Sequence, residues 1–277
     1  MSRRLVVGGV PWLVWPAARR PPLLLLHGFA GAPAAWEEVA GAVAGSFFVA
    51  APWLPGHDAH PGWFGSGGFT EAVDALASAL PSLAPPPWQV AGYSMGGRLA
   101  LGLLVRHPGL VARAVLVGAS AGLRGEAERR ERRATDAGWC RLLREEGVAA
   151  FLDAWEAQPL FATQRRLPAA RCEAQRRWRS ALPAEGLARC LEALGLAAMP
   201  DLWPALSAIQ VPVRLVVGEE DRKFVGLAEA MAAELPQGRV GVVRGAGHNV
   251  VLEAPEEVAA YLLGTGEEAA RCKEERV

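Results

Sequence analysis

The sequence predicts an α/β protein with a mostly parallel, doubly wound sheet and a helical cap inserted after the sixth strand. Short apolar runs of strand length alternate with segments of helical period along residues 23–118, and again along residues 213–263. Between them, residues 123–204 are rich in Arg and Glu, helical in period and free of strand-like runs. A helical insertion of this kind is typical of a cap over the carboxyl ends of the strands, where such sheets bind ligands.

Two interpretations compete for the N-terminal segment. Arg3 and Arg4, followed by an apolar run, imitate a twin-arginine or secretory signal. Prolines at positions 11 and 16 interrupt the helix that a signal segment would form, which favours a β-hairpin with strands at 5–8 and 11–15. We therefore expect a cytoplasmic protein. No run approaches the roughly 20 apolar residues that span a bilayer, so no membrane insertion is expected.

The first part of the core begins with a continuous apolar run. Residues 23–27 end at Gly28, as in a strand that is buried on both faces. Further strands are expected at 47–51, 88–91 and 114–118, and helices at 36–44, 69–80 and 98–107. Pro81 and the prolines at 85–87 are predicted to end the second of these helices.

The alternation resumes after the insertion. Strands are expected at 213–218 and 239–243, and helices at 227–235 and 258–263. The predicted organisation is therefore a core in two parts, 1–122 and 206–265, a helical cap over 123–205, and a mobile polar tail over 266–277.

Composition excludes some function classes. The 277 residues are 51% hydrophobic and 21% charged, which is too apolar for a disordered chain. Twenty-nine basic residues balance 29 acidic ones, so a nucleic-acid partner is not expected. Four scattered cysteines contain no CxxC pair, which indicates free thiols with neither a disulfide framework nor a zinc site. We expect no metal and no cofactor, and a monomer or small homo-oligomer.

The strongest chemical signal is Gly92-Tyr93-Ser94-Met95-Gly96, which fits G-x-S-x-G between a predicted strand and a predicted helix. Small residues on both sides allow a tight, strained turn that exposes a nucleophilic hydroxyl, here that of Ser94. The amide of Met95 then points to the place where an oxyanion would develop.

A serine nucleophile of this type needs an acid and a histidine later in the chain. Of the five histidines, only His248 lies well downstream, in a Gly-rich loop after a late strand. Asp221 follows strand 213–218 by a short loop and is the predicted acid, with Glu219 and Glu220 as rivals. His107 precedes a proline at a helix end and is predicted to be a helix cap.

The end of the first parallel strand supplies a second predicted oxyanion donor. His27-Gly28-Phe29 follows that strand, and the donor would be the amide of Phe29. His27 and His57 are both predicted to be structural, with their rings hydrogen-bonded to nearby backbone.

These segments together resemble the α/β-hydrolase family. Within it, the chain resembles the 2-succinyl-6-hydroxy-2,4-cyclohexadiene-1-carboxylate synthases of menaquinone biosynthesis. The resemblance rests on segments 92–98, 155–161, 200–202, 218–224 and 246–249. It implies a lyase that removes pyruvate by elimination from a cyclohexene bearing three carboxylates. Asp58 departs from the pattern, because the family usually has glycine after His57.

The resemblance also implies three arginines for the substrate carboxylates: Arg98 after the elbow, and Arg132 and Arg179 in the cap. Arginine suits carboxylates because its planar guanidinium binds them with two hydrogen bonds. Arg98 is expected to reach the pocket floor. Arg132 shares its helix with other arginines at 129, 130 and 133, any of which is an alternative. Tyr93 and Trp155 are expected to form pocket walls.

Other functions use the same residues. A carboxylesterase or a C–C bond hydrolase would act through the same Ser, Asp and His. A non-catalytic receptor is disfavoured because all three residues are present. The leading prediction is the elimination enzyme, with a small polycarboxylate substrate as its partner.

Overall fold

The computed structural model describes residues 2–58 and 67–265, so the tail predicted to be mobile lies outside the described residues. The described part of the chain forms one sheet of eight strands in the order β1-β2-β4-β3-β5-β6-β7-β8. The strands are β1 (Arg3–Val7), β2 (Val10–Trp15), β3 (Pro22–Leu26), β4 (Phe48–Pro52), β5 (Trp88–Tyr93), β6 (Val111–Val117), β7 (Val213–Gly218) and β8 (Gly238–Val243). From β4 to β8 neighbouring strands are parallel, whereas β1 and β2 pair antiparallel at one edge.

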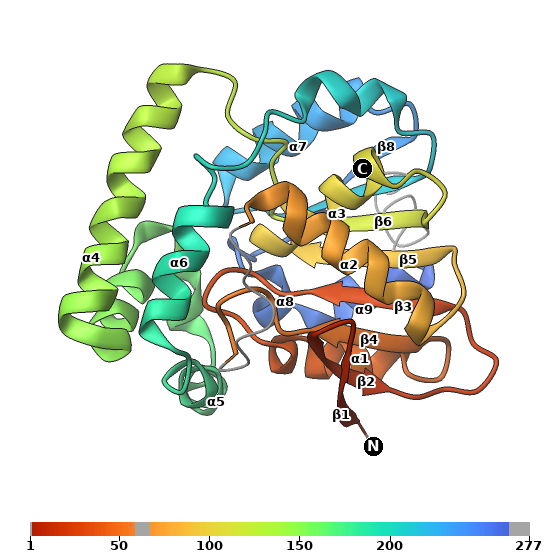
Figure 1. The fold of residues 1–277 in the computed structure, drawn as a ribbon, viewed down its shortest axis with the longest axis horizontal. Coiled ribbons are helices and arrows are strands. Elements are labelled where there is room, and N and C mark those ends of the chain that lie inside the picture. Colours follow the sequence, from red (N-terminus) through yellow and green to blue (C-terminus); the bar gives the residue numbers. More distant parts are fainter. Residues whose placement is uncertain (1, 59–66, 266–277) are drawn as a thin grey trace.

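Helices cover both faces of this sheet (Figure 1). One face carries α2 (Phe69–Leu83), α3 (Met95–Arg106) and α7 (Arg222–Glu234), and the other carries α1 (Glu37–Val43), α8 (Val250–Glu253) and α9 (Pro255–Leu263). The leucines of β3 alternate between the two: Leu24 and Leu26 pack in the first core, Leu23 and Leu25 in the second. Burial on both faces explains why this strand is a continuous apolar run.

The structure confirms the N-terminal hairpin, because β1 pairs with β2 and β2 joins the sheet through β4. It corrects the expected end of the second helix. Pro81 lies inside α2, which continues to Leu83, and the amide of Ala84 still donates to the carbonyl of Leu80. A proline this close to the carboxyl end disrupts little of the helix, which continues for two residues beyond it.

The cap lies between β6 and β7 and contains α4 (Glu126–Glu156), α5 (Ala169–Arg179), α6 (Ala184–Leu194) and the 3-10 helix η3 (Pro159–Arg166). Figure 1 shows these elements grouped at one end of the sheet. Gly147, with φ of 81°, divides α4. The cap has a hydrophobic core of its own, which includes Leu143, Phe151 and Leu187 and also takes in Ala30 from the loop after β3.

The cap and the core also touch backbone to backbone. A Cβ on Gly56, in the turn after β4, would stand 2.1 Å from the carbonyl oxygen of Gly186 in α6. Only glycine permits this approach. No helix within the described residues is both long and apolar enough to cross a membrane.

Candidate active site

Ser94 stands at the turn between β5 and α3 in a strained conformation. Its φ is 50° and its ψ is −109°, a region that non-glycine residues rarely adopt. Glycines make the turn possible: a Cβ on Gly92 would lie 2.3 Å from the carbonyl oxygen of Gly96, and one on Gly96 would lie 2.1 Å from that of Leu26. The G-x-S-x-G spacing therefore has a direct steric cause here.

The structure brings Ser94, His248 and Asp221 into one hydrogen-bonded chain. Nε2 of His248 lies 3.3 Å from Oγ of Ser94, and Nδ1 lies 2.7 Å from Oδ2 of Asp221. A carboxylate accepts, so Nδ1 carries the proton and Nε2 is left to accept from the hydroxyl. His248 and Asp221 are both buried. The arrangement suits removal of a proton through Ser94.

Two glycine-containing loops bring the acid and the base together. A Cβ on Gly218, at the end of β7, would stand 2.1 Å from the carbonyl oxygen of Gly247. This contact places the loop after β7 against the loop that carries His248. Asp221 is also the N-cap of α7, and its Oδ1 accepts from the amide of Phe224 at 3.4 Å.

The rival acids have other partners. Oε2 of Glu219 accepts from the amide of Gly245 at 3.0 Å. Glu220 is exposed and forms an ion pair of 2.8 Å with Arg166 of the cap. Of the three candidates, Asp221 is the one whose carboxylate contacts His248.

Aromatic rings surround the imidazole of His248. Its centroid lies 4.5 Å from that of Phe224, 5.5 Å from Tyr93 and 6.2 Å from Phe161 of the cap. Gly118 lies close beside it, since a Cβ there would be 3.0 Å from Cε1. Sequence reasoning assigned no role to Phe224 or Phe161, although both lie in the segments that carried the family resemblance.

Met95 and Phe29 are the predicted oxyanion donors. Met95 is the first residue of α3, so its amide has no carbonyl partner within that helix. Phe29 follows β3, and its ring packs edge-on against Trp155 at 5.3 Å between centroids. Trp155 in turn lies 6.0 Å from Phe161. The cap thus connects the Phe29 loop to the rings around His248.

The rings of His27 and His57 accept hydrogen bonds from the backbone of the same region. The amide of Leu54 donates to Nε2 of His27, and the amide of Ala30 donates to Nε2 of His57, both at 3.0 Å. Nδ1 of His57 in turn lies 2.9 Å from the carbonyl of Pro55. Each Nε2 must be unprotonated to accept, so both rings are neutral. Burial lowers the pKa of His57 to about 4 and that of His27 well below its usual value.

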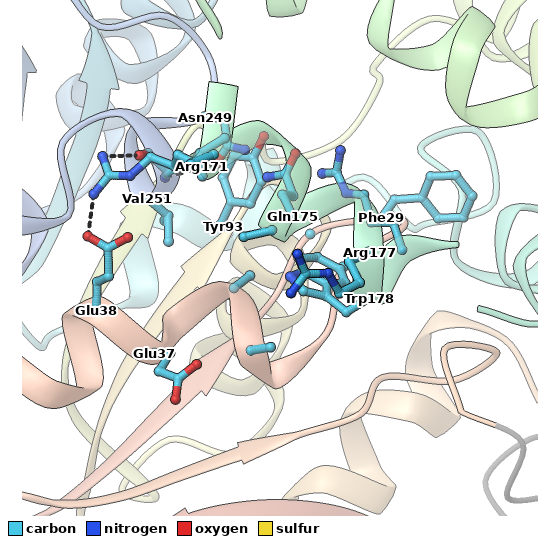
Figure 2. Close-up of a pocket in the computed structure, with 18 residues that line it drawn as sticks. Phe29, Glu37, Glu38, Tyr93, Arg171, Gln175, Arg177, Trp178, Asn249 and Val251 are labelled. Atoms are coloured by element: carbon cyan, nitrogen blue, oxygen red, sulfur yellow. Dashed lines mark hydrogen bonds and ion pairs between the residues drawn. The ribbon is translucent and has the colours of Figure 1, made fainter. Parts of the chain in front are cut away.

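A cavity of about 700 Å³ lies between the core and α5 of the cap (Figure 2). Its lining includes Phe29, Tyr93, Gln175, Arg179 and Asn249. Ser94, Asp221 and His248 are not among the lining residues, but the ring of Tyr93 connects the cavity to them, because its centroid lies 5.5 Å from that of His248. Burial raises the pKa of Tyr93, so its hydroxyl stays neutral.

Arg179 is the predicted carboxylate ligand that lines this cavity. Its side chain is buried, its Nη1 lies 3.2 Å from Oε1 of Glu156, and its Nε is buried without a hydrogen-bond partner. Burial lowers the pKa of Arg179 below its usual value. Gln175, one helical turn earlier, is buried and lines the same cavity. Sequence reasoning missed Gln175, which the i, i+4 spacing could have revealed.

Arg98 and Arg132 are not among the residues that line this cavity. Contrary to the expectation that it reaches the pocket floor, buried Arg98 donates from Nη1 to the carbonyl of Leu194 at 2.9 Å. Leu194 is the last residue of α6, so the carboxyl end of this cap helix offers the oxygen. Burial lowers the pKa of Arg98 to about 10, and the nearby charge of Arg132 adds to the effect. Arg132 pairs with Asp136 at 2.9 Å.

Trp155 also lies outside the cavity lining, behind Phe29. Among the other arginines of α4, Arg129 donates to the carbonyls of Met199 and Leu123 and holds the ends of the cap together. The described residues contain no group of three or more His, Cys, Asp or Glu side chains that could hold a metal ion.

Known proteins share this architecture. The α/β-hydrolase family pattern matches residues 23–261. The 2-succinyl-6-hydroxy-2,4-cyclohexadiene-1-carboxylate synthase of Salmonella agona (strain SL483) is 36% identical over 245 residues, which cover 87% of this chain and 92% of that protein. The Salmonella newport (strain SL254) synthase matches to the same extent.

Solved structures agree with this result. MenH from S. aureus superimposes with a TM-score of 0.87 and 28% identity, covering 93% of this chain and 98% of that one. A thermophilic esterase from Thermogutta terrifontis gives a TM-score of 0.79 at 24% identity, covering 95% and 97%, and shares the fold. The chain belongs to the α/β-hydrolase family and, within it, to the 2-succinyl-6-hydroxy-2,4-cyclohexadiene-1-carboxylate synthases.

Proposed function

We propose that this protein is a carbon–oxygen lyase of menaquinone biosynthesis. It eliminates pyruvate from 2-succinyl-5-enolpyruvyl-6-hydroxy-3-cyclohexene-1-carboxylate and forms 2-succinyl-6-hydroxy-2,4-cyclohexadiene-1-carboxylate. One observation carries the proposal: the Ser94–His248–Asp221 hydrogen bonds lie beside Tyr93, which lines a cavity together with buried Arg179, in a protein 36% identical to synthases of that name.

The substrate carries three carboxylates, which need cationic partners where the cavity removes them from water. Arg179 offers its unpartnered Nε to one of them. Arg98 and Arg132 complete the proposed set. In binding, Arg98 exchanges the carbonyl oxygen of Leu194 for a carboxylate oxygen, which is the stronger acceptor because it is charged. Tyr93 and Trp155 form or support the apolar walls.

The chemistry begins with loss of a ring proton next to a carbonyl group. Oγ of Ser94 takes the proton as its own hydroxyl proton passes to Nε2 of His248, and Asp221 stabilises the imidazolium. The amides of Met95 and Phe29 hold the oxygen on which negative charge develops. The electron pair of the broken C–H bond forms the 2,3 double bond, the pair of the existing 3,4 double bond shifts to the 4,5 position, and the C5–O bond breaks. The released enolate takes up the proton held by His248 and becomes pyruvate. No covalent bond forms between the substrate and the enzyme.

An ester or C–C bond hydrolase is the second candidate. The same serine, histidine and oxyanion amides would support attack on a carbonyl and an acyl-enzyme. The two candidates differ in whether Ser94 becomes covalently modified.

Pyruvate release, followed with lactate dehydrogenase and NADH, tests the proposal. We expect kcat/KM for the cyclohexene substrate to exceed that for p-nitrophenyl esters by orders of magnitude. The rate should be unchanged by a metal chelator, and the intact mass of enzyme quenched during turnover should be that of the unmodified chain. A serine adduct on this substrate, or esters that react faster, would overturn the lyase and favour the hydrolase.

A further inference from the structure

Glu156 lies behind the cavity, at the end of α4, and its carboxylate bridges two arginines of α5. Oε1 lies 3.2 Å from Nη1 of Arg179, and Oε2 lies 2.9 Å from Nη1 of Arg176. Glu156 is not part of the cavity lining, whereas Arg179 is. A carboxylate of the protein therefore already occupies one side of the guanidinium that faces the cavity.

The two arginines depend on Glu156 to different degrees. Arg176 is partly exposed and has a second ion pair, of 2.5 Å, with Asp153. The side chain of Arg179 is only 6% exposed, and Glu156 is its one ion-pair partner among the described residues. A buried guanidinium without a counter-charge is strongly unfavourable, so Glu156 stabilises the charge of Arg179 while the cavity is empty.

We propose that Glu156 is a built-in counter-anion that competes with a substrate carboxylate for Arg179 and so limits the affinity of the site for carboxylate ligands. The inference rests on the proposed function, because it assigns the Nε side of Arg179 to a carboxylate. A bound carboxylate at Nε and Glu156 at Nη1 would lie on one guanidinium. Two carboxylates bound to the same guanidinium are close together and repel each other.

This competition has a consequence for turnover. Without Glu156 the site would hold any carboxylate more tightly, including the product, which keeps the carboxylates of the succinyl chain and the ring. With Glu156 present, Arg179 has an alternative partner as the product leaves. Glu156 is thus a positioning and specificity residue that touches neither substrate nor reacting atoms.

The test compares wild type with Glu156→Gln, which removes the charge but keeps an acceptor for Nη1. The probe is an aromatic analogue of the product, a benzoate that carries a succinyl chain, and its binding is measured by calorimetry without turnover. We expect the variant to bind it about threefold to tenfold more tightly. KM for the substrate should fall by a similar factor without a rise in kcat. Glu156→Ala should shift the affinity in the same direction.

Two controls isolate the contact. Asp153→Asn makes the same carboxylate-to-amide change on the far side of Arg176 and should leave the affinity unchanged. In an Arg179→Gln background, Glu156→Gln should no longer tighten binding. Thermal melts show that each variant is folded.

The outcomes separate the two proposals. Unchanged or weaker binding in both Glu156 variants, or a gain that persists without Arg179, overturns the role of Glu156 and leaves the lyase standing. If wild type does not bind the analogue at all, the polycarboxylate site itself is wrong, and the inference falls with it.

Discussion

The polar side chains of the site are positioned by different interactions in the core and in the cap. In the core, backbone fixes the polar groups: Ser94 by a glycine-lined turn, and the rings of His27 and His57 by amides and carbonyls. In the cap, charged side chains fix one another, as Glu156 does for Arg179. The core therefore presents its groups in a geometry that local sequence determines. The cap presents charges whose positions depend on distant partners, and its binding properties can change by single substitutions.

The largest expected effect comes from the core. Ser94→Ala, His248→Ala and Asp221→Asn should each lower kcat by about three to six orders of magnitude, since such residues act as a unit. Circular dichroism should show an intact fold. The matched control is Glu220→Gln, whose exposed side chain pairs with Arg166 and not with His248. An active Asp221→Asn beside an inactive Glu220→Gln would reverse the assignment of the acid.

The second effect tests whether backbone fixes the elbow. Gly96→Ala would push a methyl group to 2.1 Å from a carbonyl oxygen of β3, so it should lower the unfolding free energy by about 2–4 kcal/mol and abolish activity. Gly41→Ala is the control, because nothing lies within 4 Å of that position in α1. It should raise stability by about 0.5–1 kcal/mol in urea unfolding. Equal effects of the two changes would contradict the steric account.

A third prediction concerns the cap. Arg179→Gln should lower kcat/KM for the polycarboxylate substrate by about 10–100-fold, which corresponds to about 1.5–3 kcal/mol for lost charged hydrogen bonds. Any turnover of neutral aryl esters should be nearly unaffected. Arg141→Gln, an exposed arginine of α4 with no predicted role in binding, is the control and should change neither rate. Equal losses on both substrates would indicate that Arg179 is structural.

The smallest effect is a dependence of stability on pH. Burial lowers the pKa of His57 from 6.5 to about 4, so the unfolded chain takes up a proton that the folded chain excludes. The contribution of His57 is complete above pH 6.5 and is lost as pH falls toward 4, by about 2 kcal/mol between pH 8 and pH 5. Urea unfolding of wild type and His57→Gln across this range should show a flatter profile for the variant. Identical profiles would mean that His57 does not contribute.

The contrast between core and cap explains which features the sequence could predict. The hairpin, the parallel strands and the helices of the core follow from apolar runs and turns, which are local. The predicted helix end at Pro81 was wrong because a proline near a helix end allows the helix to continue for two more residues. The meeting of Ser94, Asp221 and His248 was foreseen because each follows a strand end.

The direction in which a long side chain points is harder to predict from local sequence. Arg98 and Arg179 are both arginines near the site, yet one turns to the carbonyl of Leu194 and the other to the cavity. The difference depends on which cap segment packs over each residue. That contact joins residues almost a hundred positions apart, which no local pattern encodes.

The glycine contact between the two halves bears on how this enzyme could be re-engineered. Gly56 meets the backbone of Gly186, and a Cβ on Gly247 would stand 2.2 Å from Oγ1 of Thr163 in η3. A chimaera could exchange residues 123–205 for the cap of another family member. It would suffer a steric clash unless the new cap has equally small side chains at the positions of Gly186 and Thr163. Choosing donors by these two contacts, rather than by overall identity, would give libraries in which new pockets are placed over an undisturbed serine.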